Sequence, residues 1–324
     1  MKRWDIPVKN RKDENRMKAC EKKAAKKKLN GKNSLRNEID AWVLMLPMII
    51  ILYLFVWRST VMGIVWSFFN MKAYSVRDFC GLDNYIKVLT HTHFLPTLFN
   101  TFKYVFWSLV IGYLPPLFIA IMINEIIHFK NQFRVIIYIP AVIPGIAAML
   151  MWYYIYYPDK TGLLNMLLGK IGIEPYQWLN NPKFTIIGLI IFSTWKGFAS
   201  AMLLYYAALQ SASVEVYEAA LIDGAGPYRR LRHVTFPAIE GVLLLTFIRQ
   251  IIGVFQVLQE PLAMTGGGPN GASTSISFQL YQYGFNSGGK ATGQAMALGV
   301  IIFLILIVFT IFYFWFNRKI EERY

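Results

Sequence analysis

The sequence predicts an all-α integral membrane protein with six transmembrane helices. Of its 324 residues, 56% are hydrophobic and only 16% are charged, whereas soluble domains have about 25% charged residues. Six apolar runs reach the roughly 20 residues that a helix needs to cross the hydrocarbon core. They cover residues 42–62, 104–123, 135–154, 184–204, 238–258 and 295–316.

The chain begins with a basic tail, residues 1–40, in which 14 Lys and Arg outnumber 6 Asp and Glu. A basic segment before a first span sets the orientation of the protein and attracts anionic lipid headgroups. We therefore expect the net charge of +15 to serve topology and lipid contact, not nucleic-acid binding. The apolar run that follows is span-length and lacks a small-residue cleavage site, which argues against a secretory signal.

The rest of the chain is expected to form four parts. The first transmembrane helix lies within residues 41–70, and an extracellular loop covers residues 71–99. A five-helix core, residues 100–316, contains a polar interruption at 215–237, and a short cytoplasmic tail, 317–324, follows.

Prolines lie inside or beside three of the apolar runs. Pro47 is in the first run, Pro115 and Pro116 are in the second, and Pro140 and Pro144 are in the third. Proline removes a helical hydrogen bond, so we expect kinks that neighbouring helices tolerate in a bundle.

The distribution of basic residues predicts that both termini are cytoplasmic, in a multi-pass plasma-membrane protein. With the N-terminus inside, the inner segments hold 22 Lys and Arg and the outer segments hold 7, in agreement with the positive-inside rule. The tail supplies 14 of the 22 and so decides the orientation. The inner segments are 1–40, 124–134, 208–237 and 317–324, and the outer segments are 70–99, 156–183 and 259–293.

The polar interruption at residues 215–237 has the pattern of two short helices joined by a turn. Residues 217–222 are helix formers, and the run Gly224-Ala225-Gly226-Pro227 ends that helix. A second amphipathic turn follows before Pro237. The many charged residues place this segment at the membrane face.

Three sequence stretches resemble ABC-importer permeases. Glu218-Ala219-Ala220, then Asp223-Gly224-Ala225 and later Phe236-Pro237, resemble the signature cytoplasmic loop of that family. The stretch VFQVLQEPLAMTGGGPNGAST resembles an outer loop of the sugar-permease branch, and Gly81-Leu82-Asp83-Asn84-Tyr85 provides a third match. The matches follow the family order from Gly81 to the C-terminus.

The resemblance implies the type I ABC importer permease fold, with residues 100–316 as the permease core and a cytoplasmic coupling helix. In that family the loop docks into a groove on the ATPase and transmits its closure. Glu218 would meet a basic residue of the ATPase, Gly224 would form the turn, and Asp223 would cap it. The implied coupling residues are Glu218, Ala219, Ala220, Asp223, Gly224 and Ala225.

The resemblance also implies partners. They are a second homologous permease, two ATPase subunits, an extracellular solute-binding protein, the carbohydrate substrate and membrane lipid. This chain would bind no cofactor, because ATP and Mg²⁺ would be used by the ATPase. The run Gly266-Gly267-Gly268-Pro269 lacks the preceding strand and the following Lys-Ser/Thr of a phosphate loop.

Two cations fall near the middle of predicted spans. Lys196 and Arg249 each cost about 2.5–3.5 kcal/mol at a helix centre, so each needs protein or water around it. They either line a polar pathway or make structural contacts with backbone carbonyls or the second permease. Trp195, Gln250 and Gln256 are further pathway candidates, because sugars bind aromatic faces and amides.

The expected function is that of a permease subunit of an ABC importer for a carbohydrate, of oligosaccharide size. An alternative is a permease for glycerol 3-phosphate or a related anionic solute. A lower-ranked alternative is an ion-gradient transporter, which would use midplane carboxylates, yet the predicted spans contain no Asp.

We do not expect an enzyme or a metal site. No nucleophile–base pair is evident, and two cysteines allow no metal-binding spacing. His91 and His93 are expected to be polar loop residues. The sequence does not identify the sugar, the ATPase or the division of ligand contacts between the two permeases.

Overall fold

The computed structural model describes residues 33–72, 75–125, 130–211 and 214–322. The chain forms two compact units, residues Met1–Met62 and Gly63–Tyr324. Most of the basic tail lies outside the described residues.

The first unit contains most of one long helix. This long helix is made of α2 (Asn33–Ile51), the π-helical segment η1 (Leu52–Trp57) and α3 (Arg58–Trp66). The last residues of α3 belong to the second unit. The stretch Asp40–Trp66 is long and apolar enough to cross a membrane, in agreement with the span predicted at 42–62. Pro47 lies inside α2.

In the second unit the end of α3 is followed by an antiparallel hairpin, β1 (Phe69–Lys72) and β2 (Ser75–Phe79). The predicted loop at 71–99 therefore has regular structure, since it also contains α4 (Asp83–Thr90) and the start of α5 (Phe94–Trp107). Asn84 is buried, and its Nδ2 donates to the carbonyls of Ser67 (2.9 Å) and Phe69 (3.0 Å). The Gly81–Tyr85 motif thus joins the hairpin to α4.

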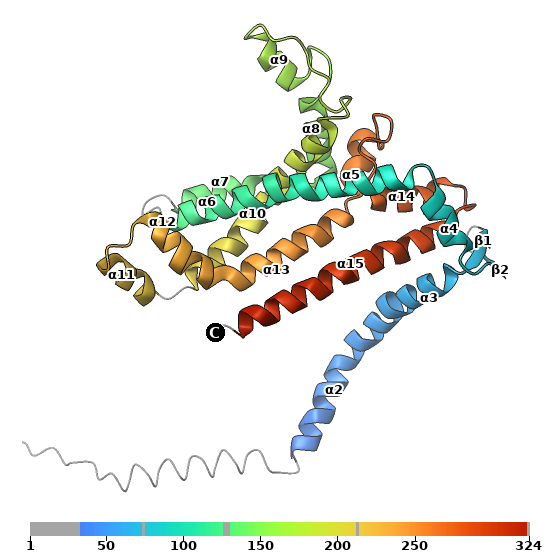
Figure 1. Ribbon diagram of the computed structural model, residues 1–324, viewed down its shortest axis with the longest axis horizontal. Helices are drawn as coiled ribbons and strands as arrows, with labels where there is room; N and C mark the ends of the chain where they lie inside the picture. The colour runs from blue at the N-terminus through green and yellow to red at the C-terminus, as the bar shows by residue number, and fades with distance from the viewer. Residues whose placement is uncertain (1–32, 73–74, 126–129, 212–213, 323–324) are drawn as a thin grey trace, which may run out of the picture. The chain divides into compact units, whose positions relative to one another are not determined.

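Four further helical rods in the second unit are candidate membrane spans, and they agree with the spans predicted at 104–123, 184–204, 238–258 and 295–316. The last helix reaches Glu321, so it includes most of the predicted tail at 317–324. The rods run side by side in Figure 1. They comprise α5, η2 (Ser108–Tyr113) and α6 (Leu114–Glu125); α10 (Thr185–Gln210); α12 (Pro227–Arg230), η3 (Leu231–Thr235) and α13 (Phe236–Phe255); and α15 (Thr292–Glu321).

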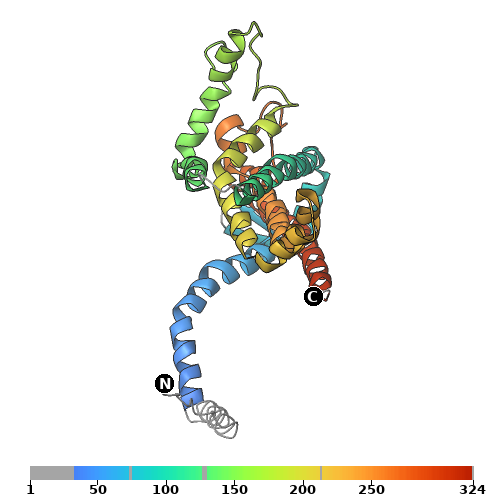
Figure 2. The same cartoon turned by 90° about the vertical axis from the view of Figure 1, so that its left-hand side faces the viewer.

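The third span, predicted at 135–154 with kinks at its prolines, is bent far more sharply than a kink. Its halves, α7 (Lys130–Val142) and α8 (Gly145–Ile155), meet at an angle of 95°. Pro144 causes the break, because it has no N–H and disfavours helical geometry at the preceding residue. The bend directs α8 and α9 (Leu163–Gly169) away from the bundle (Figure 2).

A single buried amide organises the lobe formed by residues 156–184. Asn165 is 2% exposed, and its Nδ2 lies 3.0–3.2 Å from four backbone carbonyls, including that of Tyr176. Its Oδ1 accepts from the backbone N–H of Tyr176 (3.0 Å) and from Nε1 of Trp178 (2.9 Å). The lobe is therefore closed by polar contacts as well as by aromatic packing.

The glycine-rich loop after α13 is fastened to α5. It follows η4 (Pro261–Thr265) and leads into α14 (Ile276–Tyr281) and η5 (Gln282–Asn286). Tyr104 donates to the carbonyl of Ser273 (2.9 Å), and Asn100 donates to that of Gly271 (2.9 Å). Gly267 has φ +86°, and a Cβ there would lie 2.6 Å from the Phe278 ring. Only glycine fits this position without a clash.

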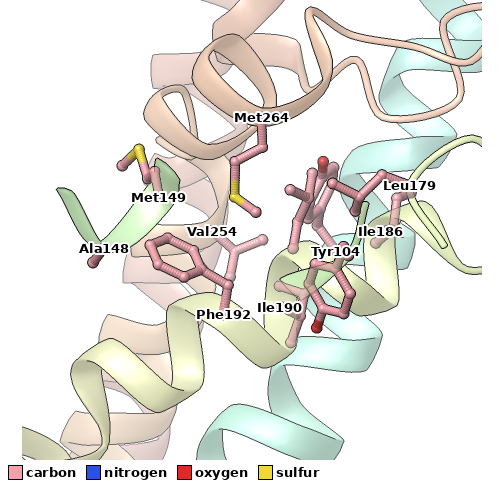
Figure 3. Packing of buried hydrophobic residues seen from close by; sticks show 11 residues of the cluster. Tyr104, Ala148, Met149, Leu179, Ile186, Ile190, Phe192, Val254 and Met264 are labelled. Atoms are coloured by element: carbon pink, nitrogen blue, oxygen red, sulfur yellow. The ribbon is translucent and has the colours of Figure 1, made fainter. Parts of the chain in front are cut away.

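The apolar core holds the rods together. One buried cluster includes Tyr104, Ile190, Phe192, Val254 and Met264, which come from α5, α10, α13 and η4 and face one another in Figure 3. A second cluster joins α13, α14 and α15, and a third joins α6, α10 and the start of α13. Because α10 contributes to two clusters and α13 to all three, these helices form the centre of the unit.

Candidate coupling loop and transmembrane cavity

The candidate coupling loop is a short helix followed by a turn whose shape the main chain sets. Helix α11 (Val214–Ile222) lies with α12 at one end of α10 and α13 (Figure 1). The N–H of Ala225 donates to the carbonyl of Ala220 (2.9 Å), and that of Gly224 donates to Leu221 (3.1 Å). Gly224 has φ +71°. These bonds and this φ define a Schellman motif, which favours glycine at its left-handed position.

The side chains predicted to couple to an ATPase are accessible at this turn. Glu218, Ala219, Asp223 and Gly224 are exposed, while Ala220 and Ala225 are half-buried. The Asp223 carboxylate accepts no hydrogen bond within the described part of the chain, where backbone bonds close the turn. The loop therefore presents a small, open surface on which the Glu218 and Asp223 carboxylates have no hydrogen-bond partner among the described residues.

Tyr217 joins the candidate coupling helix to two spans. Its hydroxyl lies 2.7 Å from Oγ1 of Thr235 at the end of η3, and it donates to Oε1 of Glu125 at the end of α6 (3.2 Å). The Arg230 guanidinium lies 5.7 Å from the centre of the Tyr217 ring, within cation–π range. One side chain of α11 therefore contacts residues at the end of α6 and at the end of η3.

A cavity of about 180 Å³, lined by both polar and apolar side chains, lies between η2, α10, α13 and the segment after α13. Gln250 donates to the Ser108 hydroxyl (2.5 Å), and Ser193 donates to Oε1 of Glu260 (2.9 Å). A Cβ on Gly112 would lie 3.0 Å from Nε2 of Gln250, so the absent side chain leaves room for the amide. The cavity thus offers hydroxyl, amide and carboxylate groups inside an apolar bundle.

Among the residues predicted for the pathway, Gln250 lines this cavity. The Trp195 ring instead packs against Trp152, with 5.5 Å between the ring centres. Arg249 and Gln256 are exposed on this chain and do not line the cavity. A role for those two in substrate contact would require the surface of another chain.

The Lys196 ammonium lies at the broken third span. It donates to the carbonyls of Pro140 and Ala141, each at 3.1 Å, and to that of Ile143. These carbonyls lie at the end of α7, where a cation stabilises the negative pole of the helix. Of the two roles considered for Lys196, lining the pathway or making structural contacts, this geometry matches structural contact with backbone carbonyls.

Four polar groups of the cavity were missed by sequence reasoning: Ser108, Ser193, Thr194 and Glu260. The hydroxyl residues are small and lie within apolar runs, where they do not interrupt the hydropathy. Glu260 was assigned to the outer segment because it follows the fifth apolar run. The sequence feature that could have indicated Glu260 as a cavity residue was its closeness to the polar residues Gln256 and Gln259.

The residues described by the structure include no group of three or more His, Cys, Asp and Glu side chains that could hold a metal ion. The rings of His91 and His93 are 5.4 Å apart, and both residues are exposed. The backbone N–H of His93 donates to Nδ1 of His91 (3.3 Å). This geometry fits the expectation that they are polar loop residues.

Comparison with known families decides the class of the protein. The profile of the family described as "Binding-protein-dependent transport system inner membrane component" matches residues 117–322, more than half of the chain. The chain belongs to this family. Its members are membrane permease subunits of ABC importers, so this chain is a multi-pass permease subunit that takes part in transport.

Curated permeases resemble this one over most of its length. The trehalose/maltose transport permease of Thermococcus litoralis is 31% identical over 88% of this chain and 96% of its own. The arabinooligosaccharide transport permease of Bacillus subtilis is 30% identical over 71% and 74%. The sn-glycerol-3-phosphate transport permease of Yersinia pestis is 32% identical over 76% and 83%.

A solved structure shares the fold of this permease. A chain of the bacterial ABC transporter for the acidic polysaccharide alginate superposes with a TM-score of 0.79 at 22% identity, covering 89% of this chain and 98% of its own. The expected type I permease fold is therefore confirmed.

Proposed function

We propose that this permease forms half of the transmembrane pathway of an ABC importer for a carbohydrate of disaccharide or oligosaccharide size. The observation that carries the proposal is the cavity between η2, α10 and α13. Its hydroxyl, amide and carboxylate groups can exchange hydrogen bonds with sugar hydroxyls. Relatives named for trehalose and maltose and for arabinooligosaccharides support this substrate class.

A second, homologous permease would complete the pathway. The cavity of about 180 Å³ is smaller than the roughly 300–1,000 Å³ of ligand pockets, so one chain supplies only part of a saccharide site. The exposed side chains of Arg249 and Gln256 would then face the partner. The orientation inferred from the basic residues places both termini in the cytoplasm.

Transport would be driven through the exposed turn at Gly224. In this proposal two ATPase subunits bind ATP and Mg²⁺, and their closure displaces α11, with Glu218 contacting the ATPase. The Tyr217 contacts with Glu125 and Thr235 then carry the displacement into the second and fifth spans. This is rigid-body coupling through an interface.

An extracellular solute-binding protein would deliver the sugar. The alginate transporter was also solved in complex with a pentasaccharide-bound periplasmic protein, which supports this arrangement. Glycerol 3-phosphate remains a second candidate substrate, because the Yersinia pestis permease named for it is 32% identical over 83% of its length.

The test is uptake into proteoliposomes that contain the complex, purified through a tag on this chain, together with its binding protein. Labelled maltose, trehalose, arabinotriose and glycerol 3-phosphate are supplied with and without internal ATP. We expect ATP-dependent uptake of a neutral saccharide, and its loss in Glu218→Ala and Gly224→Asp variants that still assemble in the membrane. Uptake that needs no ATP, or full uptake by both variants, would contradict the proposal.

A further inference from the structure

The carboxylate of Glu260 lies in the cavity between the second, fourth and fifth spans. Glu260 precedes η4, is half-buried, and accepts a hydrogen bond from Ser193 of α10 (2.9 Å). A carboxylate is seldom buried without a compensating charge. Glu260 is only half-buried, so it keeps part of its hydration, but the desolvated part of its carboxylate still needs hydrogen-bond donors or a positive charge.

Among the residues that the structure describes, no cation lines the cavity to balance that charge. The described residues that line it include no Lys, Arg or His, so Glu260 is its one charged group there. Lys196 lies on the same helix as Ser193, but its ammonium is bonded to carbonyls at the end of α7. Arg249 neighbours Gln250 but is exposed and does not line the cavity.

Two consequences follow from a carboxylate that has no counter-charge among the described residues lining the cavity. A cleft lined by one sign of charge changes the local concentration of a charged solute by about tenfold or more, so an anion is repelled. In addition, a carboxylate has about four acceptor positions, and Ser193 donates one hydrogen bond to them. The remaining positions can accept from hydroxyl or ammonium groups of a solute.

We propose that Glu260 is a specificity-determining residue that admits neutral and cationic saccharides and excludes anionic ones. The inference rests on the proposed function, since it assigns a substrate class to the same cavity. It also decides between the two candidates, because glycerol 3-phosphate and uronic-acid saccharides carry the excluded charge.

The experiment compares two probes that differ mainly in one charge, maltitol and maltobionate, with lactitol and lactobionate as a second pair. Their dissociation constants are measured by saturation-transfer NMR on the complete complex in nanodiscs, without binding protein. The test variant is Glu260→Gln, which keeps the acceptor for Ser193. The matched control is Glu240→Gln, which removes a negative charge from α13 outside the lining of the cavity.

For the wild type and for Glu240→Gln we expect the neutral probe to bind about tenfold or more tightly than its anionic counterpart. In Glu260→Gln the two dissociation constants should approach each other, mainly through tighter binding of the anion. If the ratio of the two dissociation constants is unchanged in Glu260→Gln while the neutral probe still binds, the role of Glu260 is overturned. The proposed function is not affected by that result. Failure of every probe to bind the wild type counts against the saccharide pathway itself.

Discussion

The hydroxyl of Tyr217 lies 2.7 Å from Oγ1 of Thr235. The two residues belong to α11 and to η3, which leads directly into α13. The contact therefore links the candidate coupling helix to the fifth span across the turn at Gly224. The same hydroxyl also reaches Glu125 at the end of α6, so three helical segments meet at one side chain.

Substitution of Tyr217 by Phe should weaken this link without disturbing the fold. A typical hydrogen bond contributes about 1 kcal/mol, and a loss of that size changes an equilibrium about fivefold. We expect ATP-driven uptake to fall several-fold relative to ATP hydrolysis in proteoliposomes. Tyr228→Phe is the control, because Tyr228 is 71% exposed. Equal uptake-to-hydrolysis ratios in both variants would argue against transmission through Tyr217.

Substitution of Gly224 by Ala should distort the turn. A left-handed conformation costs an L-residue about 1–2 kcal/mol, and Gly224 has φ +71°. Gly226 has φ −66° and open space around its Cα, so Gly226→Ala is a matched control. We expect less ATPase to copurify with Gly224→Ala than with Gly226→Ala. Similar recovery of ATPase in both preparations would contradict a role for the turn geometry.

Removal of the Lys196 charge should destabilise the broken span. Lys196→Met leaves three carbonyls without their donor, and each unsatisfied group costs about 1–3 kcal/mol. We expect the melting temperature of the purified complex to fall by about 5 °C or more. Lys196→Arg should recover part of the loss. Lys183→Met, at an exposed site, should leave the melting temperature near that of the wild type.

Substitution of Asn165 by Ala should loosen the lobe at residues 156–184. The change removes the amide that bonds to Tyr157, Pro158, Asp159, Tyr176 and Trp178. We expect amide hydrogen exchange within the lobe to accelerate about tenfold, as a loss of about 1.4 kcal/mol implies. Asn180→Ala, at an exposed site of the same lobe, should leave exchange unchanged. Unaltered exchange in Asn165→Ala would show that aromatic packing alone closes the lobe.

Hydropathy located the spans because the hydrocarbon core imposes both a length and a composition on each helix. The helix–turn arrangement at 215–227 was equally predictable, since Gly224 and Pro227 have strong conformational preferences. The 95° bend was not predictable to the same degree. Prolines indicated a kink, but its size depends on the Lys196 contacts with a segment more than 50 residues earlier.

The cavity was the least predictable feature, because its polar residues come from three separate helices and from the segment after α13. Gln250 stood out as an amide inside an apolar run, whereas Ser108 and Ser193 barely lower the local hydropathy. Glu260 lies just beyond the fifth apolar run, and only the packing of that segment against α10 brings it to Ser193. Trp195 and Arg249 stood out in the sequence as pathway candidates, but both lie outside the lining of the cavity.

The hydrogen bonds between Lys196 and the carbonyls at the end of α7 also constrain the order in which the helices fold. Ribosomes synthesise α7 and α8 before α10, so the bent segment reaches the membrane while its lysine is still missing. Exposed carbonyls are costly in hydrocarbon, and the bend is therefore unfavourable at that moment. We therefore expect the bend to form only after the fourth span has inserted and Lys196 can reach these carbonyls.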